Sequence, residues 1–179
     1  MRRWVLKELY GSNNLLDKKP RLKILILGPY GPESALRRLV DVKEYLISRG
    51  YESTKLAKDF NPEKMTDQEV FEMSRELMKN WADALFFFFF AESVREGRLI
   101  GVYDEFVTLC ESIPEKISKS VVFIDKDIYK KLSMMFRGRI TCFKGEFDLK
   151  VAFLESQEDT RKKAEMHAFN LLVSLGDTL

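Results

Sequence analysis

The sequence has few of the residues on which many catalytic and metal sites depend. Its 179 residues include two cysteines, Cys110 and Cys142, and one histidine, His167. These are too few ligands for an ordinary zinc site. The cysteines lie in separate apolar segments and are predicted to be buried thiols, although a disulfide is an alternative. A Ser-His-Asp mechanism would depend on His167 alone, so we interpret His167 as structural and expect no metal ion and no cofactor.

Long apolar runs and an excess of one charge are also absent. No apolar run reaches the roughly 18 residues that span a bilayer, and "MRRWVLKELYGSNN" lacks the apolar core of a signal peptide. The net charge is +2 with 32% charged residues, and basic and aromatic residues do not alternate as nucleic-acid binding would require. We therefore expect a cytoplasmic protein without membrane or nucleic-acid contacts. Scarce glutamine beside abundant lysine, arginine and glutamate indicates a thermophilic source.

The 45% apolar content excludes a disordered chain. Residues 1–20 are broken by "GSNN" and "DKKP", so we predict an N-terminal arm there and a single α/β domain over residues 21–179. The arm could dock on the body of the protein or on a partner subunit. Docking on a partner subunit would suit a homo-oligomer.

Five consecutive phenylalanines, Phe86 to Phe90, indicate the centre of the fold. The run 85–90 has no polar position, which is typical of a parallel strand covered by helices on both faces. Strands and helices alternate along the chain, so we predict a three-layer α/β fold, a flavodoxin- or Rossmann-like doubly wound sheet of about five mainly parallel strands. The other predicted strands are 24–27, 51–57, 120–125 and 139–144; the predicted helices include 66–80, 100–113, 126–135 and 158–175. Residues 91–99 are predicted to be a loop, and residues 145–156 are left open between a hairpin and an additional edge strand.

Ligands of such sheets bind beyond the carboxyl ends of the strands. The loop "GPYGPES" follows the first strand, where Gly28 would let a ligand approach the backbone and Tyr30 could stack on a base. The loop matches neither the dinucleotide fingerprint nor a Walker loop, so a tight strand-to-helix turn is an alternative. The nearby arginines could attract a phosphate or be solvated surface charges; they are Arg37, Arg38, Arg95 and Arg98.

Glu105 is the most informative acidic residue. On a helical wheel of residues 100–113 it borders the apolar stripe that should face the sheet, whereas Asp104 and Glu111 should be solvated. The helix dipole and desolvation would shift its pKa in opposite directions. Glu105 is therefore either a carboxylate satisfying backbone donors or an acid at the mouth of a ligand pocket. The stripe consists of Val102, Phe106, Leu109 and Ile113.

Three segments in this order, "KILILGPYG", "ADALFFFFF" and "GVYDEF", resemble the nucleoside 2-deoxyribosyltransferase-like family, which is related to TIR-type NAD-cleaving domains. The resemblance spans roughly residues 23–111. It implies that Gly28, Pro29 and Tyr30 line a nucleoside pocket and that Glu105, four residues after Gly101, is the nucleophile that forms a covalent sugar–enzyme intermediate.

The same resemblance matches Asp83 to the aspartate that opens the family's central strand. The sequence departs from the family around Gly101, where Ile100 and Val102 replace an aspartate and a threonine. We therefore expect a nucleoside 2-deoxyribosyltransferase-like protein that acts on, or binds, the N-glycosidic part of a nucleoside, nucleotide or NAD-like ligand through Glu105, as a deoxyribosyltransferase or an N-glycoside hydrolase. The alternative is a non-catalytic nucleotide-sensing or protein-interaction module of the same fold.

Overall fold

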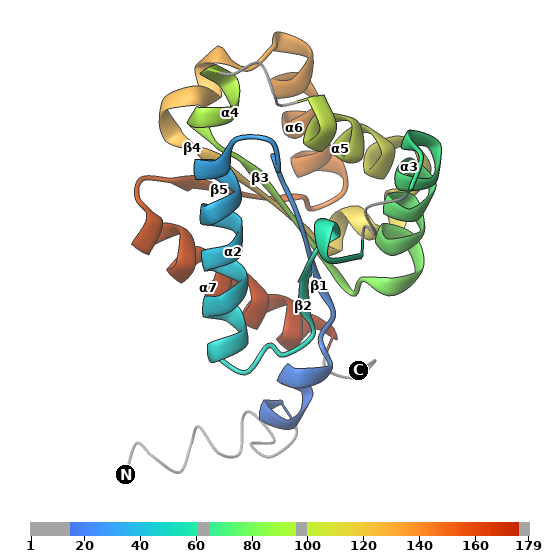
Figure 1. The fold of residues 1–179 in the computed structure, drawn as a ribbon, viewed down its shortest axis with the longest axis vertical. Helices are drawn as coiled ribbons and strands as arrows, with labels where there is room; N and C mark the ends of the chain where they lie inside the picture. The colour runs from blue at the N-terminus through green and yellow to red at the C-terminus, as the bar shows by residue number, and fades with distance from the viewer. Residues whose placement is uncertain (1–14, 61–64, 96–99, 176–179) are drawn as a thin grey trace.

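The computed structural model describes residues 15–60, 65–95 and 100–175, and these ranges contain one sheet of five parallel strands (Figure 1). The strand order is β2-β1-β3-β4-β5, which is the flavodoxin-like order. The predicted three-layer α/β fold is therefore confirmed. The strands are β1 (Ile24–Leu27), β2 (Thr54–Leu56), β3 (Ala84–Phe89), β4 (Ser120–Asp125) and β5 (Lys150–Leu154).

Helices cover both faces of the sheet (Figure 1). One layer contains α2 (Glu33–Ser48) and α7 (Gln157–Leu175). The other contains α3 (Asp67–Glu76), α5 (Ile100–Ser112) and α6 (Met134–Glu146). The shorter elements are η1 (Leu16–Arg21), η2 (Ala57–Phe60), the π-helical turn η3 (Leu77–Trp81), α4 (Ala91–Arg95), η4 (Pro114–Lys119) and η5 (Lys126–Lys131).

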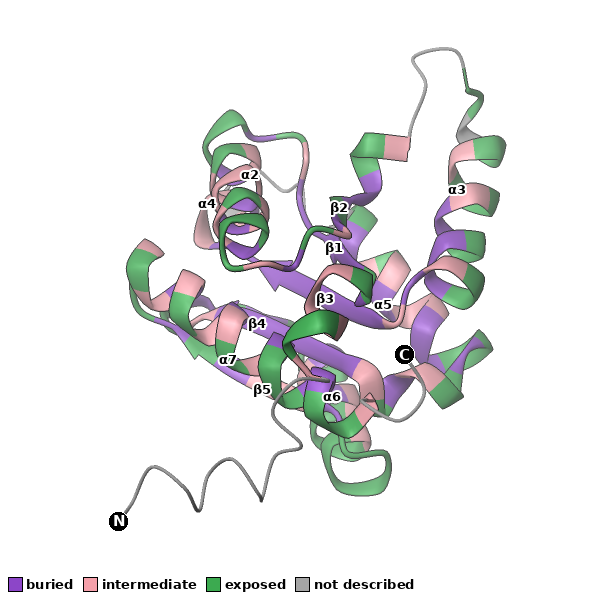
Figure 2. Ribbon diagram, turned by 90° about the horizontal axis from the view of Figure 1, so that it is seen from below, coloured by how far each residue is buried: buried purple, intermediate pink, exposed green. Residues whose placement is uncertain are grey.

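The phenylalanine run forms the buried middle of the sheet, as predicted (Figure 2). Phe86, Phe88 and Phe90 pack toward α2 and α7, while Phe87 and Phe89 pack toward α5 and α6. The alternation of side chains along a strand divides the rings between the two layers. The ring of Phe88 stacks on that of Phe123 in β4, with centroids 4.5 Å apart.

The predicted strand at 139–144 is wrong, because these residues belong to α6. Ser133 caps this helix by accepting a hydrogen bond from the Phe136 N–H at 3.2 Å, and Phe136 and Ile140 bury one helical face. The fifth strand is β5, which lies in the segment left open by the sequence. A short apolar segment is compatible with the periods of both a helix and a strand, and here the Ser133 cap favours the helix.

Three further predictions are corrected or limited. The predicted loop at 91–99 begins with α4, and residues 96–99 lie outside the described part. Cys110 is buried, but Cys142 is exposed. Residues 1–14 of the predicted arm are not described, whereas η1 contacts the body, where the Ser53 hydroxyl donates to the Pro20 carbonyl at 2.6 Å. No helix in the described ranges combines the length and apolar composition of a membrane span.

Gly28 is required by the packing of α2 on the sheet. A Cβ atom at this position would lie 2.8 Å from Leu39 Cδ2, and Leu39 is fully buried. We expect Gly28→Ala to lower the free energy of unfolding by about 1–3 kcal/mol, because the buried leucine cannot swing away. Urea denaturation measures this change.

Gly138→Ala is the matched control, since no heavy atom lies within 4 Å of a Cβ built at Gly138 in α6. This variant should be more stable than the wild type by about 0.5–1 kcal/mol, as alanine favours a helix. A Gly28→Ala protein as stable as the wild type would contradict the packing argument.

Candidate functional site

The sheet and two helices place Glu105 at the seam between α3 and α5. Phe106, the next residue, is fully buried against Phe87, with ring centroids 5.6 Å apart, which sets the rotation of α5 about its axis. Glu105 is consequently partly buried, and its carboxylate accepts a hydrogen bond from the Ser74 hydroxyl of α3 at 3.0 Å. The helical wheel of α5 is confirmed, because its predicted stripe is buried and Asp104 and Glu111 are exposed.

A hollow of about 190 Å³ opens beside Glu105 between these two helices. The α3 side of its wall combines apolar side chains with the Ser74 hydroxyl and the guanidinium of Arg75. Besides Glu105, the lining residues are Val70, Phe71, Ser74, Arg75, Met78, Gly101, Asp104 and Thr108. Gly101 and Glu105, which the sequence paired, therefore line the same hollow.

The carboxyl of Glu105 has too few partners for its degree of burial. Burial raises its pKa from the ordinary 4.5 to about 7; the hydrogen bond from Ser74 opposes this rise, and the negative charge of Asp104 adds to it. Both the protonated and the ionised forms are then populated near neutral pH; the protonated form can act as a general acid, and the ionised form as a general base or a nucleophile. A strongly shifted carboxyl beside a hollow is a candidate functional group.

Tyr30 lies within electrostatic range of Glu105. Burial raises the pKa of its hydroxyl well above the ordinary value, and the negative charge of Glu105 raises it further. The hydroxyl donates to the Ile26 carbonyl at 2.8 Å and accepts from the Ala57 N–H at 3.1 Å. Tyr30 is therefore a neutral hydroxyl that joins β1 to η2. It is not among the described residues that line the hollow at Glu105, so the expectation that it lines the same pocket is not met there.

The other residues suggested by the sequence lie elsewhere. Gly28 and Pro29 are buried, and Gly28 packs against Leu39. Asp83 precedes β3 at the amino edge of the sheet, where its carboxylate accepts a hydrogen bond from the Lys23 N–H at 3.0 Å. Asp83 is thus at the opposite edge from the loop that carries Tyr30. It joins two neighbouring strands rather than the hollow.

The sequence analysis missed the α3 side of the hollow. Ser74 is a buried hydroxyl one residue after Met73, on a helix whose other described side chains are largely exposed. A serine among the apolar positions of α3 was the available signal. Its partner could not be read from the sequence, because Glu105 is 31 residues away.

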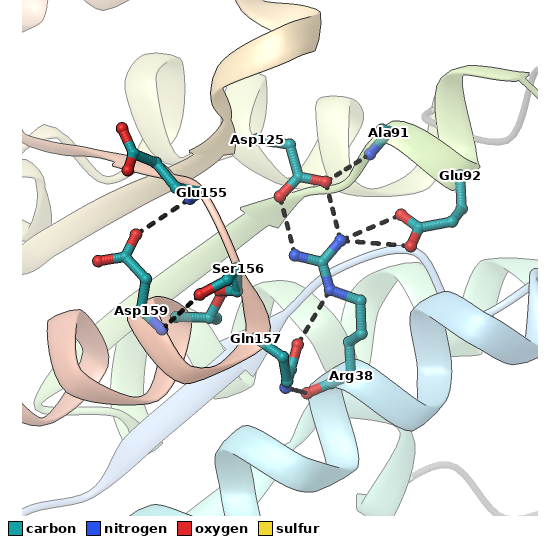
Figure 3. A network of polar contacts seen from close by, with 9 residues as sticks. Arg38, Ala91, Glu92, Asp125, Glu155, Ser156, Gln157 and Asp159 are labelled. Atoms are coloured by element: carbon teal, nitrogen blue, oxygen red, sulfur yellow. Dashed lines mark hydrogen bonds and ion pairs between the residues drawn. The ribbon is translucent and has the colours of Figure 1, made fainter.

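A second polar cluster lies at the carboxyl edge of the sheet (Figure 3). Both terminal nitrogens of Arg38 donate to Asp125 at 2.8 Å, and one also donates to Glu92 at 3.1 Å. The Nε of Arg38 donates to Gln157 at 3.1 Å, and the guanidinium lies 3.7 Å from the centroid of the Phe90 ring. Arg38 thereby connects α2 with α4, β4 and α7.

This cluster changes the interpretation of the arginines. A hollow of about 470 Å³ borders Arg38, but its guanidinium is committed to two carboxylates and an amide, so it is not a free phosphate ligand. Arg37 is exposed and pairs with Glu33. The side chain of Arg95 and the whole of Arg98 lie outside the described part of the chain.

The last candidates are His167 and the residues that could bind a metal ion. The ring of His167 packs edge-on against Phe123, with centroids 5.7 Å apart. Burial lowers the pKa of His167, and the nearby charges of Lys150 and Lys163 lower it further. Within the described residues, no group of three or more His, Cys, Asp or Glu side chains is arranged to hold a metal ion.

Comparison with known proteins does not assign a family. No protein-family model matches the chain, and no curated protein matches its sequence. The resemblance to nucleoside 2-deoxyribosyltransferase-like proteins therefore rests on the short motifs around β1, β3 and α5.

Arg38→Met should destabilise the fold, because it leaves the carboxylates of Asp125 and Glu92 without their cation. The Arg38 and Asp125 side chains are only 18% and 14% exposed, and removing one partner of such a pair costs about 2–4 kcal/mol. Arg49→Met is the control, since its bond to Glu165 is made by an arginine side chain that is 53% exposed. Its loss of stability should be much smaller than that of Arg38→Met, because solvent screens an exposed pair. Equal losses in urea denaturation would refute the distinction.

The shifted pKa of Glu105 should make stability depend on pH. Between pH 4.5 and about 7 the folded protein keeps a proton on Glu105 that the unfolded chain loses. The free energy of unfolding must therefore fall as the pH rises through this window. The shift corresponds to a loss of about 2–3 kcal/mol once partial solvent access is allowed for.

Glu105→Gln removes this ionisation. Its stability should equal that of the wild type near pH 4.5 and exceed it above pH 7, as measured by urea denaturation across the range. The matched control is Glu111→Gln on the exposed face of α5. Its ion pair with Arg139 is made by a glutamate side chain that is 60% exposed, so the variant should show the pH dependence of the wild type. A constant difference between Glu105→Gln and the wild type at all pH values would count against the assignment.

Proposed function

We propose that this protein binds a nucleoside or nucleotide at the hollow between α3 and α5 and that Glu105 acts on its N-glycosidic bond. The observation that carries the proposal is the partly buried Glu105 carboxyl, with a pKa of about 7, facing an open hollow that Ser74 and Gly101 also line. The motif resemblance supports the same residue from a separate direction. The departures at Ile100 and Val102 favour hydrolysis or binding over deoxyribosyl transfer.

The reaction needs one carboxylate and a leaving group. Ionised Glu105 attacks the anomeric carbon, the C–N bond breaks with its electron pair leaving on the base, and the base takes a proton from solvent. Water then attacks the same carbon and releases the carboxylate with the free sugar. The Ser74 hydroxyl, 3.0 Å from the carboxylate, orients it and stabilises its ionised form.

The size of the hollow fits a sugar rather than a whole nucleoside. Pockets that enclose a complete ligand usually measure roughly 300 Å³ or more, and this one measures about 190 Å³. A pentose would occupy it, and the base would lie at the rim against the exposed part of α3.

A base-release assay tests the proposal. The wild type is incubated with nucleosides, nucleotides and NAD, and free base is measured by chromatography. We expect release by the wild type, with a rate that rises as Glu105 ionises through about pH 7, and at least a hundredfold loss in Glu105→Gln. Glu111→Gln, changed on the exposed face of the same helix, should retain the wild-type rate.

Thermal unfolding with the same ligands completes the test. A ligand present at 100 times its dissociation constant stabilises the folded state by about 2.7 kcal/mol. Stabilisation without base release would replace catalysis by the alternative of a nucleotide-sensing module. If no ligand releases free base and none stabilises the folded protein, the proposal is overturned.

A further inference from the structure

Two side chains of α3, Phe71 and Arg75, stand at the rim of the hollow that contains Glu105. They are one helical turn apart, and the guanidinium carbon of Arg75 lies 5.9 Å from the centroid of the Phe71 ring. Phe71 is 49% exposed, so part of its ring is open to a ligand at this rim. An aromatic face and a guanidinium therefore border the same opening as the carboxyl.

Arg75 differs from most arginines of the described chain in having no carboxylate partner there. It is exposed, and neither Asp104 nor Glu105 lies within ion-pair distance, although both line the same hollow. Its N–H donors are consequently available to a ligand. The arginines that do pair with carboxylates are Arg37, Arg38, Arg49, Arg139 and Arg161.

We propose that Arg75 and Phe71 select a phosphorylated ligand, in which a phosphate on the ribose pairs with Arg75 and the flat base stacks on Phe71. This inference rests on the proposed function and goes beyond it by naming the ligand class and the residues that read it. A guanidinium fork binds phosphate oxygens in a bidentate manner, and a phenyl ring stacks on any base. The sugar then occupies the hollow of about 190 Å³ between them.

The charges around the hollow make Arg75 necessary for such a ligand. Asp104 and, when ionised, Glu105 would repel a phosphate on their own. Arg75 is the cation among the lining residues, so it offsets this repulsion. A neutral nucleoside does not need the offset, which is why the two ligand types should respond differently to a change at this position.

The experiment compares dissociation constants for nucleosides, their 5′-monophosphates and NAD by isothermal titration calorimetry on the full chain at about pH 5, where Glu105 is protonated and does not cleave the ligand. The wild type should bind the phosphorylated ligand at least tenfold more tightly than the nucleoside. Arg75→Gln should erase this difference while leaving nucleoside affinity within about twofold. Arg75→Lys keeps the positive charge but loses the two-pronged donor geometry of the guanidinium. It should retain part of the preference for the phosphorylated ligand. The monophosphate and NAD arms identify whether the phosphate is a single ester or a bridging diphosphate.

Two controls separate phosphate recognition from damage to the fold. Arg37→Gln removes an exposed arginine of α2 that pairs with Glu33 and should keep the full preference. Phe71→Ala should weaken the binding of nucleosides and of phosphorylated ligands alike, by about five- to fiftyfold, because both would stack a base on this ring.

The outcomes that overturn the inference are distinct from failure of the proposed function. A wild type that binds nucleosides and monophosphates equally, or an Arg75→Gln variant that weakens both equally, removes phosphate selection while nucleoside binding stands. A wild type that binds none of the ligands removes the proposed function and this inference with it.

Discussion

Burial of the β3 phenylalanines on both faces of the sheet is the constraint from which the arrangement follows. Each ring needs a helix above it, because apolar surface left in water costs roughly 25 cal/mol per Å². Phe87 packs edge-on against Phe106 of α5, and this contact fixes which side of α5 meets the sheet. The residue before Phe106 is Glu105, so hydrophobic packing carries the carboxyl to the boundary with α3.

The two polar clusters of the protein follow opposite electrostatic rules. Around Arg38 two carboxylates share a cation, since one guanidinium donates to both Asp125 and Glu92. At Glu105 a carboxyl is partly buried with the Ser74 hydroxyl as its hydrogen-bond donor and the negative charge of Asp104 nearby. The cluster around Arg38 joins elements of the fold, whereas the carboxyl of Glu105 can gain or lose a proton near neutral pH. The hollow at Glu105 is therefore the proposed site, although it is smaller than the hollow at Arg38.

The position of the site within the fold also has a physical reason. Ligands of doubly wound sheets bind where the strand connections diverge at the carboxyl edge, and here Arg38 bridges α2, α4, β4 and α7 at that edge (Figure 3). With these side chains committed to one another, the seam between α3 and α5 offers the less satisfied polar groups. Under the proposed function, the exposed face of α3, with Phe71 and Arg75, is the surface that a ligand would meet first.

The sequence by itself determined the fold class, the central strand and the rotation of α5. These depend on local periodicity: an unbroken apolar run implies a strand buried on two faces, and a 3.6-residue stripe places Glu105 at its border. The sequence also places Asp83 away from the hollow, because a residue that precedes a parallel strand lies at the amino edge of the sheet. Only the tertiary structure decided that residues 139–144 are helical, that Ser74 meets Glu105, and that Arg38 meets Asp125, 87 residues away. Such pairs depend on which helices lie side by side after the sheet has assembled, and no local pattern encodes that neighbourhood.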